Sequence, residues 1–238
     1  MKEQTDKTRL KLLKRLQKAL NASPSANVAA GPCPASSSRA CSVATPNLIP
    51  LLEEEITKTG GVFYLARDKE EIAQYLITLA KRVNAKTIIR DNSILLQGLK
   101  LDGVLNNEGL QVIIDYSGTR PAKETNEDKA AWRQPAKDAA LGVTSIEYIL
   151  ADTGTVVIKS RPGLSRTLSL VPPIHVAIGE ERQILPGLEA LFSQGANLQP
   201  GSAVIFITGP SRTADIEQTL TIGVHGPIEF HLILLPDE

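Results

Sequence analysis

The stretch GVFYLARDKEEIAQYLITLAKRVNAKTIIR, residues 61–90, carries the pattern that decides the fold. Residues 61–66 are mostly apolar and predict a strand, and Asp68 with Glu71 resembles a capping box that opens a helix. One face of that helix is apolar, made of Ile72, Leu76, Leu79 and Val83. A second apolar run, KTIIR at 86–90, completes a strand–helix–strand unit, which is typical of a parallel sheet.

The rest of the chain continues the alternation. Further strands are predicted at 110–115, 155–160, 174–179, 203–208 and 230–235. Helices are predicted at 45–60, at 183–193, within 213–222 and, as a polar stretch weakened by Pro135, at 123–140. Short β-branched runs separated by helices predict one α/β domain, with a mostly parallel sheet flanked by helices.

The N-terminal part has a different composition. Residues 1–20 predict a basic amphipathic helix with Leu10, Leu13 and Leu20 on one face. This helix could pack on its own domain or on a second subunit, or it could lie on a membrane or a partner. Residues 21–46 are mostly Ala, Ser, Pro and Gly and predict a flexible linker. The α/β domain therefore covers residues 47–238.

Charge and cysteine content exclude several classes of protein. The net charge is zero, but residues 51–238 hold 18 bases and 24 acids, which disfavours sequence-independent binding to nucleic acid. We expect no transmembrane segment and no signal peptide, and therefore a cytoplasmic protein. The two cysteines, Cys33 and Cys41, cannot supply the usual four ligands of an iron–sulfur cluster or a zinc site. They are expected to be free thiols, and a disulfide between them stays open.

Three loops carry residues suited to chemistry. The first is Ala151-Asp152-Thr153-Gly154-Thr155. Asp152 could orient a substrate hydroxyl or act as a base, or it could only fix the loop as an Asx-turn. The second is residues 160–167, which hold two arginines and several hydroxyls, a combination suited to a carboxylate or phosphate.

The third loop follows the strand predicted at 203–208 and reads GPSRTADIEQ. A glycine turn, hydroxyls and the start of the helix predicted within 213–222 are the ingredients of an anion site on exposed amides. Asp215 could instead serve only as a helix cap. The loop is neither a P-loop nor a dinucleotide-binding motif, because the chain has no GK[ST] and no G-x-G-x-x-G sequence.

The three histidines differ in their surroundings. His175 and His231 lie within predicted strands, where a hydrogen-bonded structural role is expected. His225 lies between a valine and a glycine in a turn, where it could titrate or bind at a loop rim. The histidines lack metal-ligand spacing, so we expect no metal.

Three segments resemble the LUD-domain lactate-utilisation family, in particular its LutC/YkgG branch. They are GVTSIEYILADTGTVV (142–157), RTLSLVPPIHVAI (166–178) and GPSRTADIEQTLTIGVHGP (209–227), and the likeness covers roughly 47–238. The resemblance implies a fold similar to the sugar-phosphate isomerase and CoA-transferase-like group. It also implies a role with LutA-like and LutB-like iron–sulfur proteins in oxidising L-lactate to pyruvate. The clusters are then expected in the partners, and this chain is expected to bind no cofactor.

The resemblance assigns no catalytic residue, so the candidate site is argued from chemistry. A small carboxylate such as lactate would be held by Arg166 or Arg212. The surrounding anion-binding shell would come from Thr155, Ser165, Gly209, Ser211 and Thr213. A base for the hydroxyl proton would be one of Asp152, Glu217 and His225.

Two other functions remain open. The chain could be a stand-alone isomerase-like or CoA-transferase-like enzyme that acts on a phosphorylated or CoA-linked substrate. It could also be a non-catalytic subunit that organises its partners, and a homo-oligomer is possible. Because the sequence has no nicotinamide or flavin motif, the chain alone is expected to be an incomplete enzyme.

Overall fold

The chain divides into two compact units, Met1–Thr45 and Pro46–Glu238. The computed structural model describes residues 47–116, 137–193, 203–214, 220–222 and 226–237. The helix predicted at 1–20 and the linker predicted at 21–46 lie outside the described residues. In the described part, no helix is long and apolar enough to cross a membrane.

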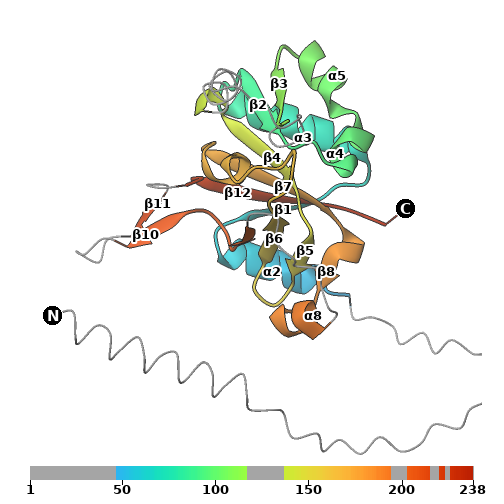
Figure 1. The fold of residues 1–238 in the computed structure, drawn as a ribbon, viewed down its shortest axis with the longest axis vertical. Helices are drawn as coiled ribbons and strands as arrows, with labels where there is room; N and C mark the ends of the chain where they lie inside the picture. The colour runs from blue at the N-terminus through green and yellow to red at the C-terminus, as the bar shows by residue number, and fades with distance from the viewer. Residues whose placement is uncertain (1–46, 117–136, 194–202, 215–219, 223–225, 238) are drawn as a thin grey trace, which may run out of the picture. The chain divides into compact units, whose positions relative to one another are not determined.

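A six-stranded sheet forms the centre of the second unit (Figure 1). Its strands, in spatial order, are β1 (Val62–Leu65), β12 (Glu229–Leu235), β7 (Ile174–Glu180), β4 (Leu141–Ser145), β2 (Thr87–Arg90) and β3 (Gln111–Ile114). Every neighbouring pair is parallel. All six strands therefore end at the same edge of the sheet.

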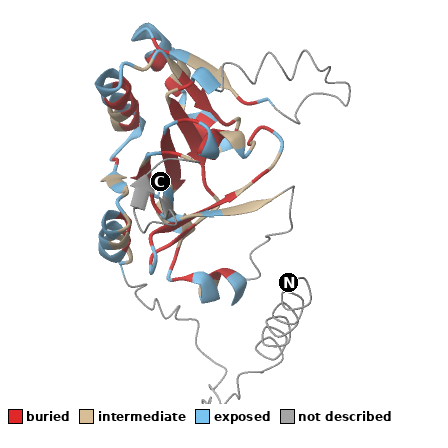
Figure 2. Cartoon of the chain, turned by 90° about the vertical axis from the view of Figure 1, so that its left-hand side faces the viewer, coloured by how far each residue is buried: buried red, intermediate tan, exposed pale blue. Residues whose placement is uncertain are grey.

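Three helices cover one face of this sheet: α3 (Lys69–Arg82), α4 (Ile94–Leu99) and α5 (Leu101–Asn107). Leu76, Leu96 and Leu105 from these helices pack with Val143 and Val176 of the sheet in one apolar cluster. Helix α3 begins where the sequence predicts, because the Asp68 side chain accepts a hydrogen bond from the Glu71 amide at 2.8 Å. Figure 2 shows the strands as the most deeply buried part of the domain.

The opposite face is covered by α2 (Ile49–Lys58), the short helix α7 (Thr167–Leu170) and a second sheet. This second sheet has the order β8 (Ile184–Leu185), β5 (Tyr148–Leu150), β6 (Thr155–Lys159) and β9 (Val204–Ile207). Strand β6 is antiparallel to both β5 and β9. Ile56 of α2 and Ile149 of β5 pack against Phe230 and Leu232 of the large sheet. The predicted α/β class with a mostly parallel sheet flanked by helices is confirmed.

Several predicted elements differ from the structure. The helix predicted at 45–60 begins at Ile49, and the one predicted at 183–193 is a 3-10 turn (Glu181–Gln183), strand β8 and helix α8 (Leu188–Ser193). The polar helix predicted at 123–140 lies mostly outside the described residues. Strands β4 and β5 and helices α4 and α5 were not predicted.

The helix predicted within 213–222 is wrong. Arg212–Ala214 (β10) and Leu220–Ile222 (β11) pair as antiparallel strands instead. Threonine and isoleucine at these positions favour strand pairing over a helix. The helix N-terminus on which the predicted anion site depended is therefore absent at Arg212–Ala214.

Candidate functional site

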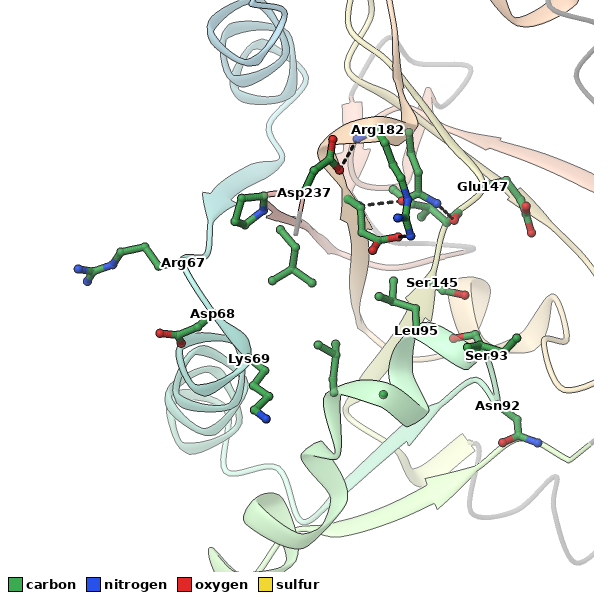
Figure 3. Close-up of a pocket in the computed structure, with 18 of the residues that line it drawn as sticks. Arg67, Asp68, Lys69, Asn92, Ser93, Leu95, Ser145, Glu147, Arg182 and Asp237 are labelled. Carbon is green, nitrogen blue, oxygen red and sulfur yellow. Dashed lines mark hydrogen bonds and ion pairs between the residues drawn. The ribbon is translucent and has the colours of Figure 1, made fainter.

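The carboxyl edge of the six-stranded sheet encloses a cavity of about 1020 Å³ (Figure 3). It is lined by residues that follow β1, β2, β4, β7 and β12. In open α/β sheets, ligands bind at this edge, where the chain reverses its direction across the sheet. Here β3 lies on one side of β2 and β4 on the other, so the reversal falls between the ends of β2 and β4.

Asp91 follows β2 and is fully buried at this reversal. Its Oδ1 accepts a hydrogen bond from the Ser93 amide at 2.9 Å. Its Oδ2 accepts from both the amide and the hydroxyl of Ser145, at 2.7 and 2.6 Å. One buried carboxylate thus joins the ends of two neighbouring strands, and its charge is offset by three short hydrogen bonds.

The preceding residue, Arg90, supports the same turn. It is 5% exposed and donates two hydrogen bonds to the Asp102 carboxylate, at 2.7 and 2.5 Å. A third bond, of 2.7 Å, goes to the Asp91 carbonyl. This bidentate pair is the geometry that a guanidinium favours, and it fixes the end of β2 beneath the cavity.

Arg161 brings a positive charge to the cavity wall from the loop after β6. Its guanidinium forms an ion pair with Glu147 and donates to the Ser145 hydroxyl at 3.1 Å. A guanidinium has five N–H donors, and these contacts use two of its nitrogens. Ser145, Glu147 and Arg161 all line the cavity, so they bring a guanidinium and a carboxylate, groups that bind anions and accept protons, to its wall.

Charges of both signs surround the cavity opening. Arg182 pairs with Glu180 at 2.5 Å, and the Arg182 amide donates to Asp237 at 3.0 Å. Arg67 extends outward, away from the cavity, in Figure 3. Among the residues that the structure describes, no group of three or more His, Cys, Asp or Glu side chains could hold a metal ion. The arginines, carboxylates and serines that line the cavity are suited to hydrogen bonding and ion pairing with a small polar molecule.

The predicted anion loop at 160–167 reaches the carboxyl ends of three strands. Its Gly163 carbonyl accepts from the Asn92 amide at 2.8 Å, beyond β2. The Ser165 amide donates to the buried Asp115 carboxylate, beyond β3, at 2.7 Å. Arg161 reaches Ser145 at the end of β4. Of the two arginines in this loop, Arg161 lines the cavity, whereas the candidate Arg166 is exposed before α7.

The predicted residues Asp152 and Thr155 lie elsewhere, on the hairpin between β5 and β6. The Asp152 amide donates to the Pro186 carbonyl at 3.1 Å, and its carboxylate lies against Gly187. The Thr155 hydroxyl is 2.8 Å from the hydroxyls of Thr153 and Thr208. These contacts hold the hairpin to its neighbours in the second sheet.

Gly209, Ser211 and Arg212 lie near the opposite end of the large sheet. Gly209 has a positive φ of 75° and lies against Thr59, where an added Cβ would be 2.8 Å from the Thr59 oxygen. The Arg212 guanidinium donates to the same Thr59 carbonyl. Gly209 and Ser211 line a separate cavity of about 230 Å³, which also contains His175. The Thr213 side chain, Asp215, Glu217 and His225 lie outside what the structure describes.

Ser145, which lines the cavity, and the buried Asp91 that it bonds were missed by sequence reasoning, and Arg161 was noted only as part of its loop. A signal existed for Asp91, because it directly follows the predicted strand 86–90 at the edge where ligands bind. The sequence gives no such signal for Ser145, because strand β4 was not predicted. Its proximity to Asp91 depends on the strand order.

The fold and the site define an α/β protein with a binding cavity at the carboxyl edge of a parallel sheet. Residues 49–235 match the LUD domain family model, and the chain belongs to this family.

The chain is also similar to individual proteins. It is 31% identical to "Lactate utilization protein C" of Exiguobacterium sp., over 71% of this chain and 80% of that protein. It is 28% identical to the protein of the same name in Halalkalibacterium halodurans, over 80% of each chain. A crystal structure of a DUF162 family protein from Deinococcus radiodurans superposes with a TM-score of 0.53 at 18% identity, covering 79% of this chain and 96% of that one. The structural likeness shows the fold alone, and the named relatives support a role in lactate utilisation.

Proposed function

We propose that this chain is a component of a system that oxidises L-lactate to pyruvate together with iron–sulfur partner proteins. The observation that carries the proposal is the similarity to proteins named lactate utilization protein C, within the LUD domain family. LutA-like and LutB-like partners and a cytoplasmic location are part of the proposal.

The chemistry of the reaction requires a partner. Oxidation of lactate to pyruvate releases two protons and two electrons, and the electrons need an acceptor. The whole chain has two cysteines, fewer than the four that hold an iron–sulfur cluster in its usual form. The proposal therefore assigns substrate binding to this chain and electron transfer to its partners.

The carboxyl-edge cavity supplies the groups that bind a small hydroxy acid. Arg161 would hold the carboxylate, and the hydroxyl of Ser145 lies 3.1 Å from the same guanidinium. Glu147, which pairs with Arg161, is the candidate to accept the hydroxyl proton. This assignment replaces Arg166 and Arg212, the arginines predicted from the sequence, because Arg161 lines the cavity.

Growth on L-lactate tests the assignment. A strain that lacks the gene should not grow on L-lactate as sole carbon source, and the wild-type gene should restore growth. Arg161→Ala should restore little growth, whereas Lys86→Ala, which removes an exposed cation next to β2, should restore it fully. Growth of the deletion strain at the wild-type rate would reject the function, and full rescue by Arg161→Ala would reject this site.

A further inference from the structure

A second cavity lies near the amino ends of β7 and β12, at the opposite edge of the large sheet from the first cavity. It has a volume of about 230 Å³, and His175, Phe206, Ser211 and Phe230 are among the residues that line it. We call it the His175 cavity. It shares no lining residue with the carboxyl-edge cavity, so the two are separate places in the fold.

His175 has an unsatisfied polar atom. The side chain is 1% exposed, and its Nε2 lies 2.8 Å from the hydroxyl of the fully buried Thr144. Among the described residues, none gives a hydrogen bond to the buried Nδ1. A buried polar atom without a partner destabilises the folded protein, so its presence calls for a ligand or an ordered water.

The Thr144 contact favours one of the two neutral forms of the His175 ring. Within the described part of the chain, the Thr144 hydroxyl has this one side-chain hydrogen bond, and a buried hydroxyl needs an acceptor. It therefore donates to Nε2, which leaves the proton on Nδ1. The unsatisfied atom is then an N–H donor that lacks an acceptor.

The imidazole is uncharged. Burial lowers the pKa of His175 to about 3, with a smaller contribution from His231. A neutral donor in a largely apolar surrounding favours an uncharged acceptor, because a buried anion would lack an opposing charge. Phe230 lies beside the ring, with 5.6 Å between the ring centroids, and adds an aromatic wall.

The surface around this cavity is apolar. Leu170 and Phe206 line it and are 45% and 44% exposed. Val171 and Ile228, each next in sequence to a lining residue, are also exposed. Ile228 is held close by because its amide donates to the Pro173 carbonyl at 2.8 Å. Exposed apolar side chains that line one cavity, as Leu170 and Phe206 do, favour a binding surface over scattered surface residues.

We propose that the His175 cavity binds a small, uncharged carbonyl compound with an apolar body, whose oxygen accepts a hydrogen bond from Nδ1 of His175. The volume is that of roughly eight water molecules in the liquid, which limits the ligand to one small ring or a short chain. The apolar part of the ligand lies against Phe206 and Phe230, and Thr144 positions the imidazole.

Nuclear magnetic resonance on the full chain with ¹⁵N-labelled histidine tests this site. Cyclohexanone is the probe, and methylenecyclohexane, which has the same shape but no oxygen, is its matched control. Cyclohexanone should shift the Nδ1–H signal of His175 and leave His231 unchanged, since both nitrogens of His231 have partners. Methylenecyclohexane should bind at least tenfold more weakly.

Variants separate the hydrogen bond from simple packing. His175→Asn keeps an N–H donor near the Nδ1 position and should retain cyclohexanone affinity within about threefold, whereas His175→Leu should lose at least tenfold. Thr144→Val should weaken binding, and Thr87→Val, the same change in another strand, should not. Three outcomes would overturn the proposal. They are equal binding of the two probes, a shift of the His175 signal by pyruvate as large as that by cyclohexanone, and no shift with cyclohexanone, which would mean that only an ordered water occupies the site. The shifts measured on the wild-type protein test the proposed site even if His175→Leu does not fold.

Discussion

Ser145 donates its amide and its hydroxyl to the same carboxylate oxygen of Asp91, at 2.7 and 2.6 Å. Asp91 directly follows β2, and Ser145 is the last residue of the neighbouring parallel strand β4. The two residues are 54 positions apart in the sequence. Their contact links the carboxyl ends of β2 and β4 beneath the large cavity. The geometry of Arg161, which also bonds Ser145, therefore depends on Asp91.

Removal of the Asp91 carboxylate should destabilise the domain. Asp91→Ala leaves the Ser93 amide and both Ser145 donors buried without their acceptor, so we expect a loss of about 2–4 kcal/mol in the free energy of unfolding. Asp91→Asn keeps an acceptor oxygen and should lose less. Chemical denaturation measures both, with Glu70→Ala on the exposed surface of α3 as control. A loss for Asp91→Ala no larger than for the control would contradict the role given to this carboxylate.

Two glycines offer a matched pair of substitutions. A Cβ at Gly142 would lie 2.0 Å from the Leu168 carbonyl oxygen, so Gly142→Ala must displace α7 from the sheet. We expect a loss at or above the upper end of about 1–3 kcal/mol. Gly98 in α4 has nothing within 4 Å of its added Cβ, and Gly98→Ala should stabilise by about 0.5–1 kcal/mol. Similar unfolding free energies for the two variants would show that the close approach at Gly142 is not real.

Arg212 is expected to stabilise the fold rather than to bind an anion. It donates to the Thr59 carbonyl at the end of α2, so Arg212→Ala should remove about 1 kcal/mol and lower Tm by about 2–4 °C. Arg166→Ala, at an exposed arginine, is the control and should leave Tm within about 1 °C. Calorimetry measures both. An unchanged Tm for Arg212→Ala, together with weaker binding of pyruvate, would show that Arg212 binds the anion and does not stabilise the fold.

The buried histidine makes stability depend on pH. Its pKa is lowered from 6.5 to about 3 in the native state, so the unfolded chain binds this proton first. The stabilisation is complete above pH 6.5 and declines as the pH falls towards 3. Near pH 5, unfolding takes up about one proton at His175, which gives a slope of about 1.4 kcal/mol per pH unit. His175→Asn should remove that slope from the curve of unfolding free energy between pH 6 and pH 4. Parallel curves for the two proteins would show that His175 does not remain neutral in the native state.

Local signals predicted much of the sheet and its main helix. The Asp68 cap and the buried face of Ile72, Leu76 and Leu79 hold in the structure, because each depends on residues three or four positions apart. The second half of the predicted capping box does not form, because the Glu71 side chain accepts from the Arg67 amide, and Val83 lies exposed at the end of the helix. Strand β4 was missed because its short sequence, LGVTS, contains a glycine, which has low strand propensity. Gly142 is needed there for the approach of α7, a contact between distant parts of the chain.

The site was harder to predict than the fold. The loop 160–167 was identified from its composition, and it does lie at the carboxyl ends of β2, β3 and β4. Yet the choice between Arg161 and Arg166 depends on which side chain turns towards Ser145, and composition says nothing about that. Likewise, the segment after Gly209 reads as a helix start in isolation, whereas its strand pairing with 220–222 comes from residues further along the chain.

We propose that this chain takes part in L-lactate oxidation only together with iron–sulfur partners. The direct measurement is purification of the tagged full chain from cells grown on L-lactate, followed by protein identification, iron analysis and an assay of L-lactate oxidation with an artificial electron acceptor. We expect the chain to co-purify with cysteine-rich proteins that contain iron, and we expect activity in the complex and not in the chain alone. Isolation of the chain without iron-containing partners, or L-lactate oxidation by the chain alone, would contradict it.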